Sequence, residues 1–361
     1  MAASALLKNP WLRPFLWPLS VLYGLGVGLR NLAYDRQWLR SHQPPLPVLC
    51  VGNLNAGGSG KTPHTELITA YLQEVLGPVG ILSRGYGRKG SAFRLATEHD
   101  GPTELGDEAY MLHAKLPTVP LAVCGDRLLG LQNLHRLHPE LKAVVMDDGF
   151  QHRRVVPTLS MVLSDYSKPF FEDSLLPFGG LREPWAAYRR AQLVLFTKCP
   201  EGLRLYDRKH LHGRIADLPS ERILCSCLRH LDPVFMEPFE QRPLNRDGHY
   251  LLVTGIANTE LLCDHLNLQG LVYKHLEFQD HVVYTTSVLE AILEAFGGLK
   301  SRHKALITTE KDYVKLVARA DFFVKHQIPL AYVPIEIYFP ERDQTLLVKH
   351  LNDFVGLCNR T

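Results

Sequence analysis

The glycine-rich segment NAGGSGKT, residues 55–62, constrains the fold of this chain more than any other feature of the sequence. It follows an apolar run at 46–51 and precedes a stretch of helical character. Glycines let successive backbone N–H groups converge on phosphate, a following lysine reaches the β- and γ-oxygens, and the threonine hydroxyl ligates Mg²⁺. The segment therefore predicts a strand, a phosphate-binding loop and a helix, whereas the alternative is a simple glycine-rich turn.

Every residue of this segment is a candidate for nucleotide binding. Asn55 stands where the usual pattern has its first glycine, and Gly57 and Gly58 supply flexibility beside it. Lys61 is the expected catalytic cation, and Thr62 is the expected metal ligand. The predicted nucleotide-binding residues are Asn55, Ala56, Gly57, Gly58, Ser59, Gly60, Lys61 and Thr62.

Short apolar runs predict the strands of an α/β fold. Six lie at 46–51, 78–83, 119–124, 141–147, 159–164 and 192–197, and five more at 221–227, 249–255, 270–278, 303–309 and 331–337. Because the runs are continuous rather than alternating, they indicate parallel strands buried on both faces. We expect a doubly wound parallel sheet, typical of phosphate-loop NTPases, and a second, smaller α/β lobe.

The chain length supports two domains. A chain of 361 residues suits roughly two domains of about 150 residues each. We expect an N-terminal segment at 1–43, a phosphate-loop core at 44–210 and a second lobe at 211–361 that contributes to the active-site cleft. Pro200, Gly202 and a polar stretch mark the expected boundary between core and lobe.

The N-terminal segment predicts contact with a membrane surface. Residues 15–29 carry no charge, but they are fewer than the roughly 20 residues that span a bilayer, and no clear signal-peptide cleavage site follows them. The flanking aromatic and arginine side chains, with a net charge of +4 over residues 1–43, suit a helix in the headgroup region. The alternative is a helix buried in the protein core.

Composition excludes several other classes. The net charge of +3 disfavours a nucleic-acid-binding protein that depends on phosphate neutralisation. The seven cysteines form no CxxC pair, which indicates reduced thiols and disfavours a cysteine metal site. No HExxH pattern is present among the 17 histidines.

Asp147 and Asp148 end an apolar run and are candidates for the magnesium site. In phosphate-loop enzymes, an acid at the end of such a strand holds the shell of the metal that neutralises phosphate charge. Acidic residues at strand ends are also common turn formers, which is the alternative for this pair.

Further polar clusters, each ambiguous alone, occur in a specific order. They are SRGYGR at 83–88, GDE at 106–108, DGFQH at 148–152, LREP at 181–184, Asp280-His281 and TEKD at 309–312. Together with the loop, they make the chain closely similar to the tetraacyldisaccharide 4'-kinases, or lipid A 4'-kinases, of Gram-negative bacteria. The resemblance extends from the N-terminal apolar segment to residue 312, which is nearly the whole chain.

The resemblance implies a reaction and a cellular location. Members of the family use ATP and Mg²⁺ to phosphorylate the 4'-hydroxyl of a tetraacylated glucosamine disaccharide 1-phosphate, the lipid A precursor, at the cytoplasmic face of the inner membrane. It implies a peripheral or monotopic enzyme whose N-terminal helix contacts the lipid surface. It implies no nucleic-acid partner, and no protein partner can be inferred.

The resemblance also implies residue roles. Asp107 would act on the acceptor hydroxyl with His281 paired to it, and Asp147 and Asp148 would belong to the magnesium site. The three arginines Arg84, Arg88 and Arg182 would lie near phosphate or the acceptor. GDE is followed here by alanine, where many relatives carry proline, which leaves Asp107 itself unaltered.

Each acceptor-side residue has a structural alternative. Asp107 suits the start of a helix before EAYML, and His281 suits a turn. A neighbouring histidine would help an aspartate, which alone is a weak base near neutral pH.

Two functional alternatives remain from the sequence. One is a phosphate-loop ATPase or GTPase of a metal-insertion or targeting type, which would hydrolyse nucleotide without a lipid acceptor. The other is a noncatalytic, nucleotide-gated membrane adaptor.

Overall fold

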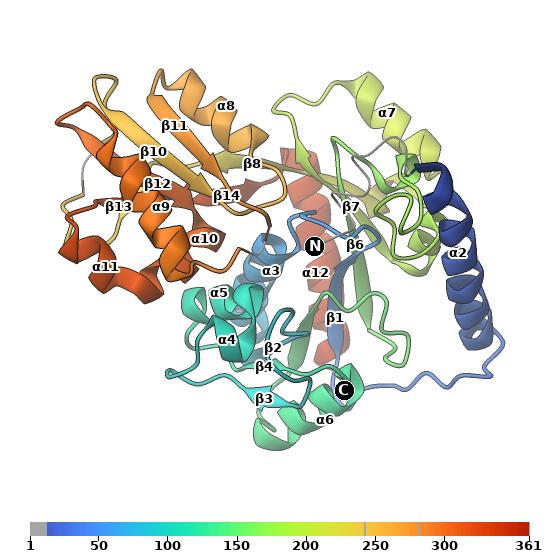
Figure 1. Cartoon of the computed structure of the whole chain (residues 1–361). Helices are drawn as coiled ribbons and strands as arrows, with labels where there is room; N and C mark the ends of the chain where they lie inside the picture. Colours follow the sequence, from blue (N-terminus) through green and yellow to red (C-terminus); the bar gives the residue numbers. More distant parts are fainter. Residues whose placement is uncertain (1–12, 242, 281, 361) are drawn as a thin grey trace. The chain divides into compact units, whose positions relative to one another are not determined.

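The computed structural model describes residues 13–241, 243–280 and 282–360 and forms two compact units (Figure 1). The first unit comprises Met1–Cys227 with Ile337–Thr361, and the second comprises Leu228–Glu336. The second unit is therefore an insertion between two parts of the first.

The first unit contains a nine-stranded sheet with the order β14-β8-β7-β6-β1-β5-β2-β4-β3. Its longer strands are β1 (Val48–Asn53), β2 (Val79–Ser83), β5 (Ala143–Asp147), β6 (Leu159–Asp165), β7 (Leu193–Cys199) and β8 (Ile223–His230). Its shorter strands are β3 (Arg94–Leu95), β4 (Leu121–Val123) and β14 (Ile335–Tyr338). The pairings from β4 through β8 are parallel, and β3 adds an antiparallel edge, so the predicted α/β class is confirmed.

Helices cover both faces of this sheet. On one face, α3 (Lys61–Leu76) and α12 (Glu341–Cys358) pack against a shared core, and α5 (Asp107–Lys115) packs on β2 and β4. The other face carries α6 (Arg127–Leu137), α7 (Leu205–Arg214) and the short helices η1 (Phe170–Glu172) and η2 (Trp185–Arg190). Short helices α4 (Pro102–Leu105) and η3 (Ser220–Arg222) complete the unit.

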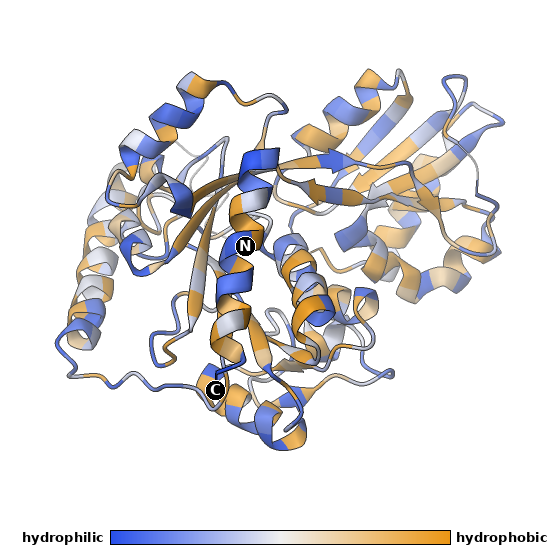
Figure 2. Ribbon diagram, turned by 180° about the vertical axis from the view of Figure 1, so that it is seen from behind, coloured by the Kyte–Doolittle hydropathy of each residue, from blue (hydrophilic) through white to orange (hydrophobic). Residues whose placement is uncertain are grey.

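The amphipathic pattern of α12 explains why the end of the chain returns to the first unit. It buries Leu347, Leu351, Phe354 and Cys358, which lie on one helical face. Figure 2 shows hydrophobic stretches along the strands and alternating hydrophobic and hydrophilic turns on α12. Burial of each large apolar side chain stabilises the fold by about 1.5–3 kcal/mol.

The second unit contains a five-stranded sheet with the order β11-β10-β12-β13-β9. Its strands are β9 (Val234–Phe235), β10 (His249–Thr254), β11 (Val272–Glu277), β12 (Lys304–Thr309) and β13 (Leu330–Val333). Its helices are α8 (Glu260–Leu268), α9 (Thr286–Gly297), α10 (Glu310–Leu316), η4 (Val317–Arg319) and α11 (Ala320–Lys325). The pairings among β10, β11, β12 and β13 are parallel, and β9 pairs antiparallel with β13, so this unit is also of the α/β type.

The units do not follow the boundary expected at 210 and 211. The run at 221–227, which was assigned to the second lobe, forms β8 and pairs in parallel with β7 of the first sheet. The C-terminal residues 337–361 also belong to the first unit. A run of apolar residues predicts a buried strand but does not specify which sheet contains its partner.

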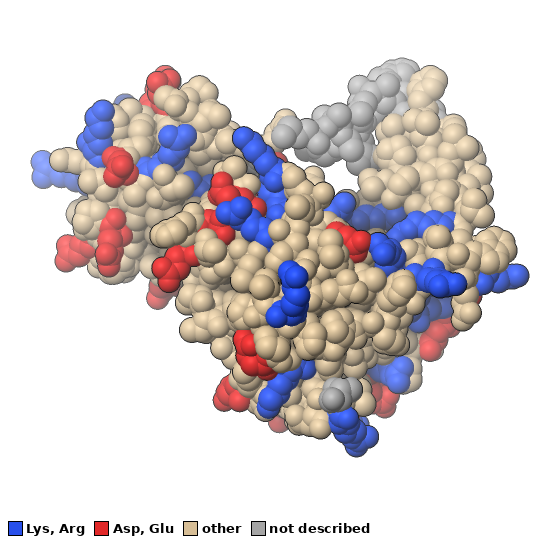
Figure 3. Space-filling model, turned by 90° about the horizontal axis from the view of Figure 1, so that it is seen from below, with Lys and Arg blue, Asp and Glu red and all other residues tan. Residues whose placement is uncertain are grey.

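The N-terminal helix α2 (Arg13–Asp35) belongs to the first unit and buries only a narrow stripe of its surface. Leu16 and Ser20 are buried, whereas Phe15, Trp17, Leu22 and Leu25 are 60–72% exposed. The alternative of a buried core helix is therefore wrong. Figure 3 shows a patch without charged side chains at its upper right, bordered below by Lys and Arg side chains.

Among the described residues, no helix combines the length and the apolar character needed to cross a membrane.

Candidate active site

The glycine-rich loop connects β1 to α3, as the sequence predicts. β1 lies between β5 and β6, and the chain continues from β1 through α3 to β2 beyond β5. Ligands of doubly wound folds bind outside the carboxyl ends of the strands at such a switch point. Gly60 precedes α3 with φ +77°, a left-handed conformation that strongly favours glycine. Lys61 and Thr62 then begin the helix and are both buried.

Asn55, the departure from the usual loop pattern, anchors the loop to the segment 173–181. Its Nδ2 donates to Asp173 Oδ2 at 2.8 Å, and its backbone forms an antiparallel bridge with Leu181. The Ala56 N–H also donates to the Gly180 carbonyl at 2.6 Å. The asparagine at position 55 therefore adds a side-chain hydrogen bond at the entry of the loop that a glycine could not form.

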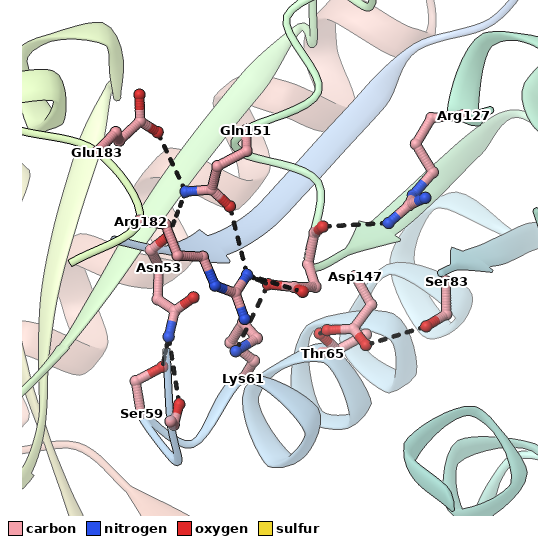
Figure 4. Close-up of polar contacts among 12 residues, drawn as sticks. Asn53, Ser59, Lys61, Thr65, Ser83, Arg127, Asp147, Gln151, Arg182 and Glu183 are labelled. Atoms are coloured by element: carbon pink, nitrogen blue, oxygen red, sulfur yellow. Dashed lines mark hydrogen bonds and ion pairs between the residues drawn. The ribbon is translucent and has the colours of Figure 1, made fainter. Parts of the chain in front are cut away.

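Asn53, the last residue of β1, braces the loop from inside. It is fully buried, and its Nδ2 donates to Ser59 Oγ at 2.9 Å and to the Gly57 carbonyl at 3.3 Å. The Gln151 amide donates to the Asn53 carbonyl at 2.7 Å. The motifs VGN and DGFQH are thus joined at the base of the loop (Figure 4).

Asp147 ends β5 and is fully buried. Its carboxylate accepts hydrogen bonds from Thr65 Oγ1 at 3.2 Å and Ser83 Oγ at 3.4 Å. Burial, followed by the charges of Glu108 and Asp148, raises the pKa of Asp147 to about 7. The charge of Lys61 lowers this pKa but does not offset burial and the two neighbouring carboxylates.

Asp148 follows directly and has the opposite electrostatic character. Its φ of 49° places it in the left-handed region and turns its side chain toward the loop. Lys61 Nζ lies 3.5 Å from Asp148 Oδ1, and Arg182 Nη1 donates to both carboxylate oxygens at 2.8 and 3.0 Å. Burial opposes ionisation of Asp148, but Lys61 and Arg182 outweigh it and hold its pKa below the ordinary value.

The LREP motif is tied to its surroundings through Arg182, which binds Asp148, and Glu183, which binds Gln151 (Figure 4). Arg182 also donates to Gln151 Oε1 at 3.4 Å, and its backbone N–H donates to the Leu54 carbonyl at 2.8 Å. Glu183 is almost fully buried and accepts two hydrogen bonds from Arg190 at 2.8 and 2.9 Å, as well as one from Gln151 at 3.1 Å. Glu183 therefore holds the LREP segment in place, a role that the sequence did not reveal.

Arg127 is a second site residue that sequence reasoning missed. Its buried guanidinium donates to the carbonyls of Cys124 at 2.9 Å and Gly125 at 3.0 Å, and to the Asp148 carbonyl at 3.3 Å. Asp126 caps α6 by accepting from two backbone N–H groups. The triplet Gly-Asp-Arg directly after a predicted strand was the available signal.

The GDE motif packs on the SRGYGR loop. Gly106 has φ +86°, and a Cβ atom there would lie 2.5 Å from the Tyr86 carbonyl oxygen. Asp107 is the first residue of α5, so the structure has the helix start that the alternative expected. The charge of Glu108 acts on Asp147, which places the GDE motif near the end of β5.

The two arginines of SRGYGR differ in their surroundings. Arg84 is exposed and close enough to Arg127 for their charges to interact. Arg88 donates to the Ala92 carbonyl within its own loop, and burial lowers its pKa. His281 lies outside the described residues, so its pairing with Asp107 stays a prediction.

The TEKD motif has a structural role in the second unit. Thr309 caps α10 by accepting from the Asp312 N–H at 3.1 Å. The buried Asp312 carboxylate accepts from the Gly255 N–H at 2.8 Å, which joins α10 to the end of β10.

Comparison with known proteins identifies the family. Residues 12–353 match the family model described as tetraacyldisaccharide-1-P 4'-kinase. The chain is 36% identical over 353 residues to a tetraacyldisaccharide 4'-kinase of Bacteroides thetaiotaomicron, covering 94% of this chain and 93% of that protein. It is 37% identical over 369 residues to the enzyme of that name from Cytophaga hutchinsonii, covering 97% and 98%.

The chain belongs to the tetraacyldisaccharide 4'-kinase family. It is thus an ATP-dependent lipid A 4'-kinase, and the ATPase, GTPase and adaptor alternatives are not favoured.

A solved structure supports the fold of this kinase. LpxK from Aquifex aeolicus, crystallised in complex with ATP, superposes with a TM-score of 0.71 at 25% identity and covers 94% of this chain and 99% of its own. The phosphate-loop fold predicted from the sequence is therefore confirmed, and ATP is the nucleotide of the family member in that crystal.

Proposed function

We propose that this kinase transfers the γ-phosphoryl group of ATP to the 4'-hydroxyl of a tetraacylated glucosamine disaccharide 1-phosphate at the carboxyl ends of β1 and β5. The observation that carries the proposal is the convergence of Lys61 and Arg182 on Asp148, beside the glycine-rich loop. Two cations held in place at the loop are what a transferring phosphoryl group requires, because its oxygens carry the charge that must be stabilised.

The nucleotide phosphates bind along residues 55–62 in this proposal. Lys61 supplies a point charge to the β- and γ-oxygens. Arg182 and Arg127 extend the positive region along the edge of the sheet, since both contact Asp148. Asp148 keeps Lys61 and Arg182 oriented until ATP competes for them.

The residues at this edge fit a magnesium ion. The hydroxyl of Thr62 and the carboxylates of Asp147 and Asp148 are hard oxygen donors of the kind that Mg²⁺ prefers. The raised pKa of Asp147 fits as well, because a buried carboxylate of this kind requires a nearby cation to stay ionised at neutral pH. When bound with ATP, the ion would neutralise charge on the β- and γ-phosphates.

The described part of the chain contains no cluster of three or more His, Cys, Asp or Glu residues that could enclose a metal. That agrees with Mg²⁺, which is usually held by one or two carboxylates together with substrate phosphates and water.

Asp107 and His281 are proposed to handle the acceptor hydroxyl. Asp107 begins α5 on the same turn as Glu108, which lies in the electrostatic range of Asp147. In this proposal, the Asp107 carboxylate accepts a proton from the incoming hydroxyl, and the paired histidine shares that proton. Arg84 and Arg88 are proposed to assist with phosphate groups of the acceptor or the nucleotide.

Helix α2 is proposed to contact the lipid surface at the cytoplasmic face of the inner membrane. Its exposed side chains include Phe15, Trp17, Leu22 and Leu25, which suit the boundary between headgroups and acyl chains. The opposite side of α2 contacts the site: Tyr23 Oη donates to the Arg182 carbonyl at 2.7 Å, and Asn31 Nδ2 donates to Glu183 Oε2 at 3.2 Å. A lipid-bound helix would therefore deliver the acceptor beside the phosphate site.

The direct test is incubation of the purified chain with γ-labelled ATP and a tetraacylated disaccharide 1-phosphate in mixed micelles. Transfer of label to the 4'-position, in proportion to ATP consumed, is expected. A Lys61→Ala variant with an unchanged melting temperature is the control. Hydrolysis of ATP at the same rate without the lipid would contradict the proposal and favour a nucleotide hydrolase.

A further inference from the structure

Three consecutive backbone carbonyls of the glycine-rich loop are each bound by a side chain from outside the loop. Lys198 Nζ donates to the Gly58 carbonyl at 2.6 Å, and Thr197 Oγ1 donates to the Ser59 carbonyl at 3.0 Å. His64 Nδ1 lies 2.7 Å from the Gly60 carbonyl oxygen. None of these three side chains belongs to a residue that the sequence motif identifies.

These bonds determine the direction of the loop's N–H groups. In a planar trans peptide, the carbonyl of one residue and the N–H of the next point in opposite directions. Fixing the carbonyls of Ser59 and Gly60 therefore directs the N–H groups of Gly60 and Lys61 away from the anchoring side chains. Those N–H groups are the ones that a phosphate-binding loop presents to its ligand.

His64 is the most deeply placed of the three anchors. It lies one turn into α3, is 1% exposed, and its ring packs edge-on against Phe339 with ring centroids 6.1 Å apart. Its Nε2 lies 2.9 Å from Ser226 Oγ on β8. Because a carbonyl only accepts hydrogen bonds, Nδ1 carries the proton, and in the neutral ring Nε2 accepts from the Ser226 hydroxyl.

Hydrogen bonds from Ser226 through His64 to Gly60 thus connect two distant parts of the first unit. They join β8, which lies three positions from β1 in the sheet, to the residue at which the loop turns left-handed. Gly60 has φ +77°, and its carbonyl also accepts from the His64 backbone N–H at 3.3 Å. Without the ring, the Gly60 carbonyl loses its shorter hydrogen bond, and the peptide that precedes Lys61 gains freedom to rotate.

We propose that His64 and Ser226 are a positioning pair for the kinase reaction: they hold the Gly60 peptide so that the loop is preorganised for the phosphates of ATP. The proposal rests on the assignment of residues 55–62 to ATP. His64 acts through the loop backbone and does not touch the reacting atoms. A purely structural role would lower stability without selectively weakening nucleotide affinity.

The test compares three variants of the full chain. His64→Leu fills much of the ring volume without any hydrogen bond, and His64→Asn retains a donor near the Nδ1 position. Ser226→Ala removes the far end of the link. Thr69→Val is the matched control, because Thr69 is a buried residue of the same helix whose hydroxyl donates to the Thr65 carbonyl at 2.6 Å.

The readouts are the dissociation constant of a fluorescent ATP analogue, the KM for ATP, the kcat and the melting temperature. His64→Leu is expected to raise the dissociation constant and the KM for ATP about tenfold, the typical effect of one lost hydrogen bond to a buried group. His64→Asn should stay within about threefold of the wild type. The KM for the lipid acceptor should not change.

Coupling provides the second criterion. If His64 and Ser226 act as one unit, Ser226→Ala in the His64→Leu background adds little to the loss of affinity. Equal ATP affinity in His64→Leu and Thr69→Val, after matching for melting temperature, would overturn the proposal, as would the absence of rescue by His64→Asn. If His64→Leu does not fold, the test rests on Ser226→Ala. An unchanged ATP affinity in Ser226→Ala would then refute the proposal. A wild-type chain that binds no ATP analogue would instead refute the loop assignment.

Discussion

Replacement of Asp147 by Asn should stabilise the nucleotide-free kinase at pH 8, although it should abolish activity. Asp147 is fully buried, and burial with its acidic neighbours raises its pKa from 3.8 to about 7. A carboxyl group whose pKa is raised on folding stabilises the fold below its unfolded pKa. That stabilisation is lost as the pH rises through about 7. Asparagine does not titrate, so the variant avoids this loss.

The magnitude follows from the interval between the two pKa values. An interval from 3.8 to about 7 corresponds to about 4 kcal/mol when the carboxylate is fully ionised. Because part of this arises from the charges of Asp148 and Glu108, which relax when Asp147 is neutral, we expect about 2–4 kcal/mol. The asparagine side chain keeps both hydrogen bonds, since its oxygen accepts from Thr65 and its amide donates to the Ser83 hydroxyl.

The assay is urea unfolding of both proteins in EDTA at pH 5, 6, 7 and 8. The difference in unfolding free energy, variant minus wild type, should increase with pH and level off above about 7. Asp148→Asn is the control of opposite sign, because Lys61 and Arg182 lower the pKa of Asp148 and its loss should destabilise the fold at pH 8. A stability difference for Asp147→Asn that is independent of pH, or negative at pH 8, would refute the reasoning.

Three further perturbations test the proposed roles. Lys61→Ala should lower kcat by orders of magnitude with an unchanged fold, measured by label transfer and circular dichroism; near-normal transfer would contradict the loop assignment. Asp107→Ala should lower kcat far more than it changes the KM for ATP, and adding His281→Ala should cost about tenfold or less in kcat. If the two losses in kcat multiply fully, Asp107 and His281 act independently. Leu22→Glu with Leu25→Glu, both on the exposed face of α2, should weaken binding to anionic vesicles without a change in melting temperature, and unchanged partitioning would contradict membrane contact.

Sequence reasoning succeeded where the signal was local. The apolar runs before residue 310 each contain a strand, and the order of strand, glycine-rich loop and helix was confirmed at β1, residues 54–60 and α3. Asp147 ends its strand as expected. These features follow from neighbouring residues, whose hydrophobicity and backbone preferences are visible in the sequence.

Non-local pairing was the part that the sequence did not reveal. β8 was assigned to the wrong sheet, because a strand's partner is chosen by the packing of distant segments. The two-residue strands β3 and β9 carry too little pattern to detect. The run at 331–337 was predicted as one strand, but it divides into β13 and β14, which belong to different sheets. His64, Arg127, Glu183 and Lys198 escaped notice because each acts through hydrogen bonds to residues that are remote in the sequence or to backbone carbonyls.

The return of α12 to the first unit has a consequence for synthesis of the chain. The core shared by α3 and α12 needs Leu347, Leu351 and Phe354, which leave the ribosome after residues 228–336. Residues 228–336 form a compact unit of their own and emerge earlier. Although domains generally fold in order from the N-terminus, here the inserted unit has all its residues available before the nucleotide-binding unit does. During translation, the sheet face behind the glycine-rich loop therefore stays incomplete until α12 docks. A chain that stops before residue 341 would retain every motif of the kinase but would lack α12 in the core behind them.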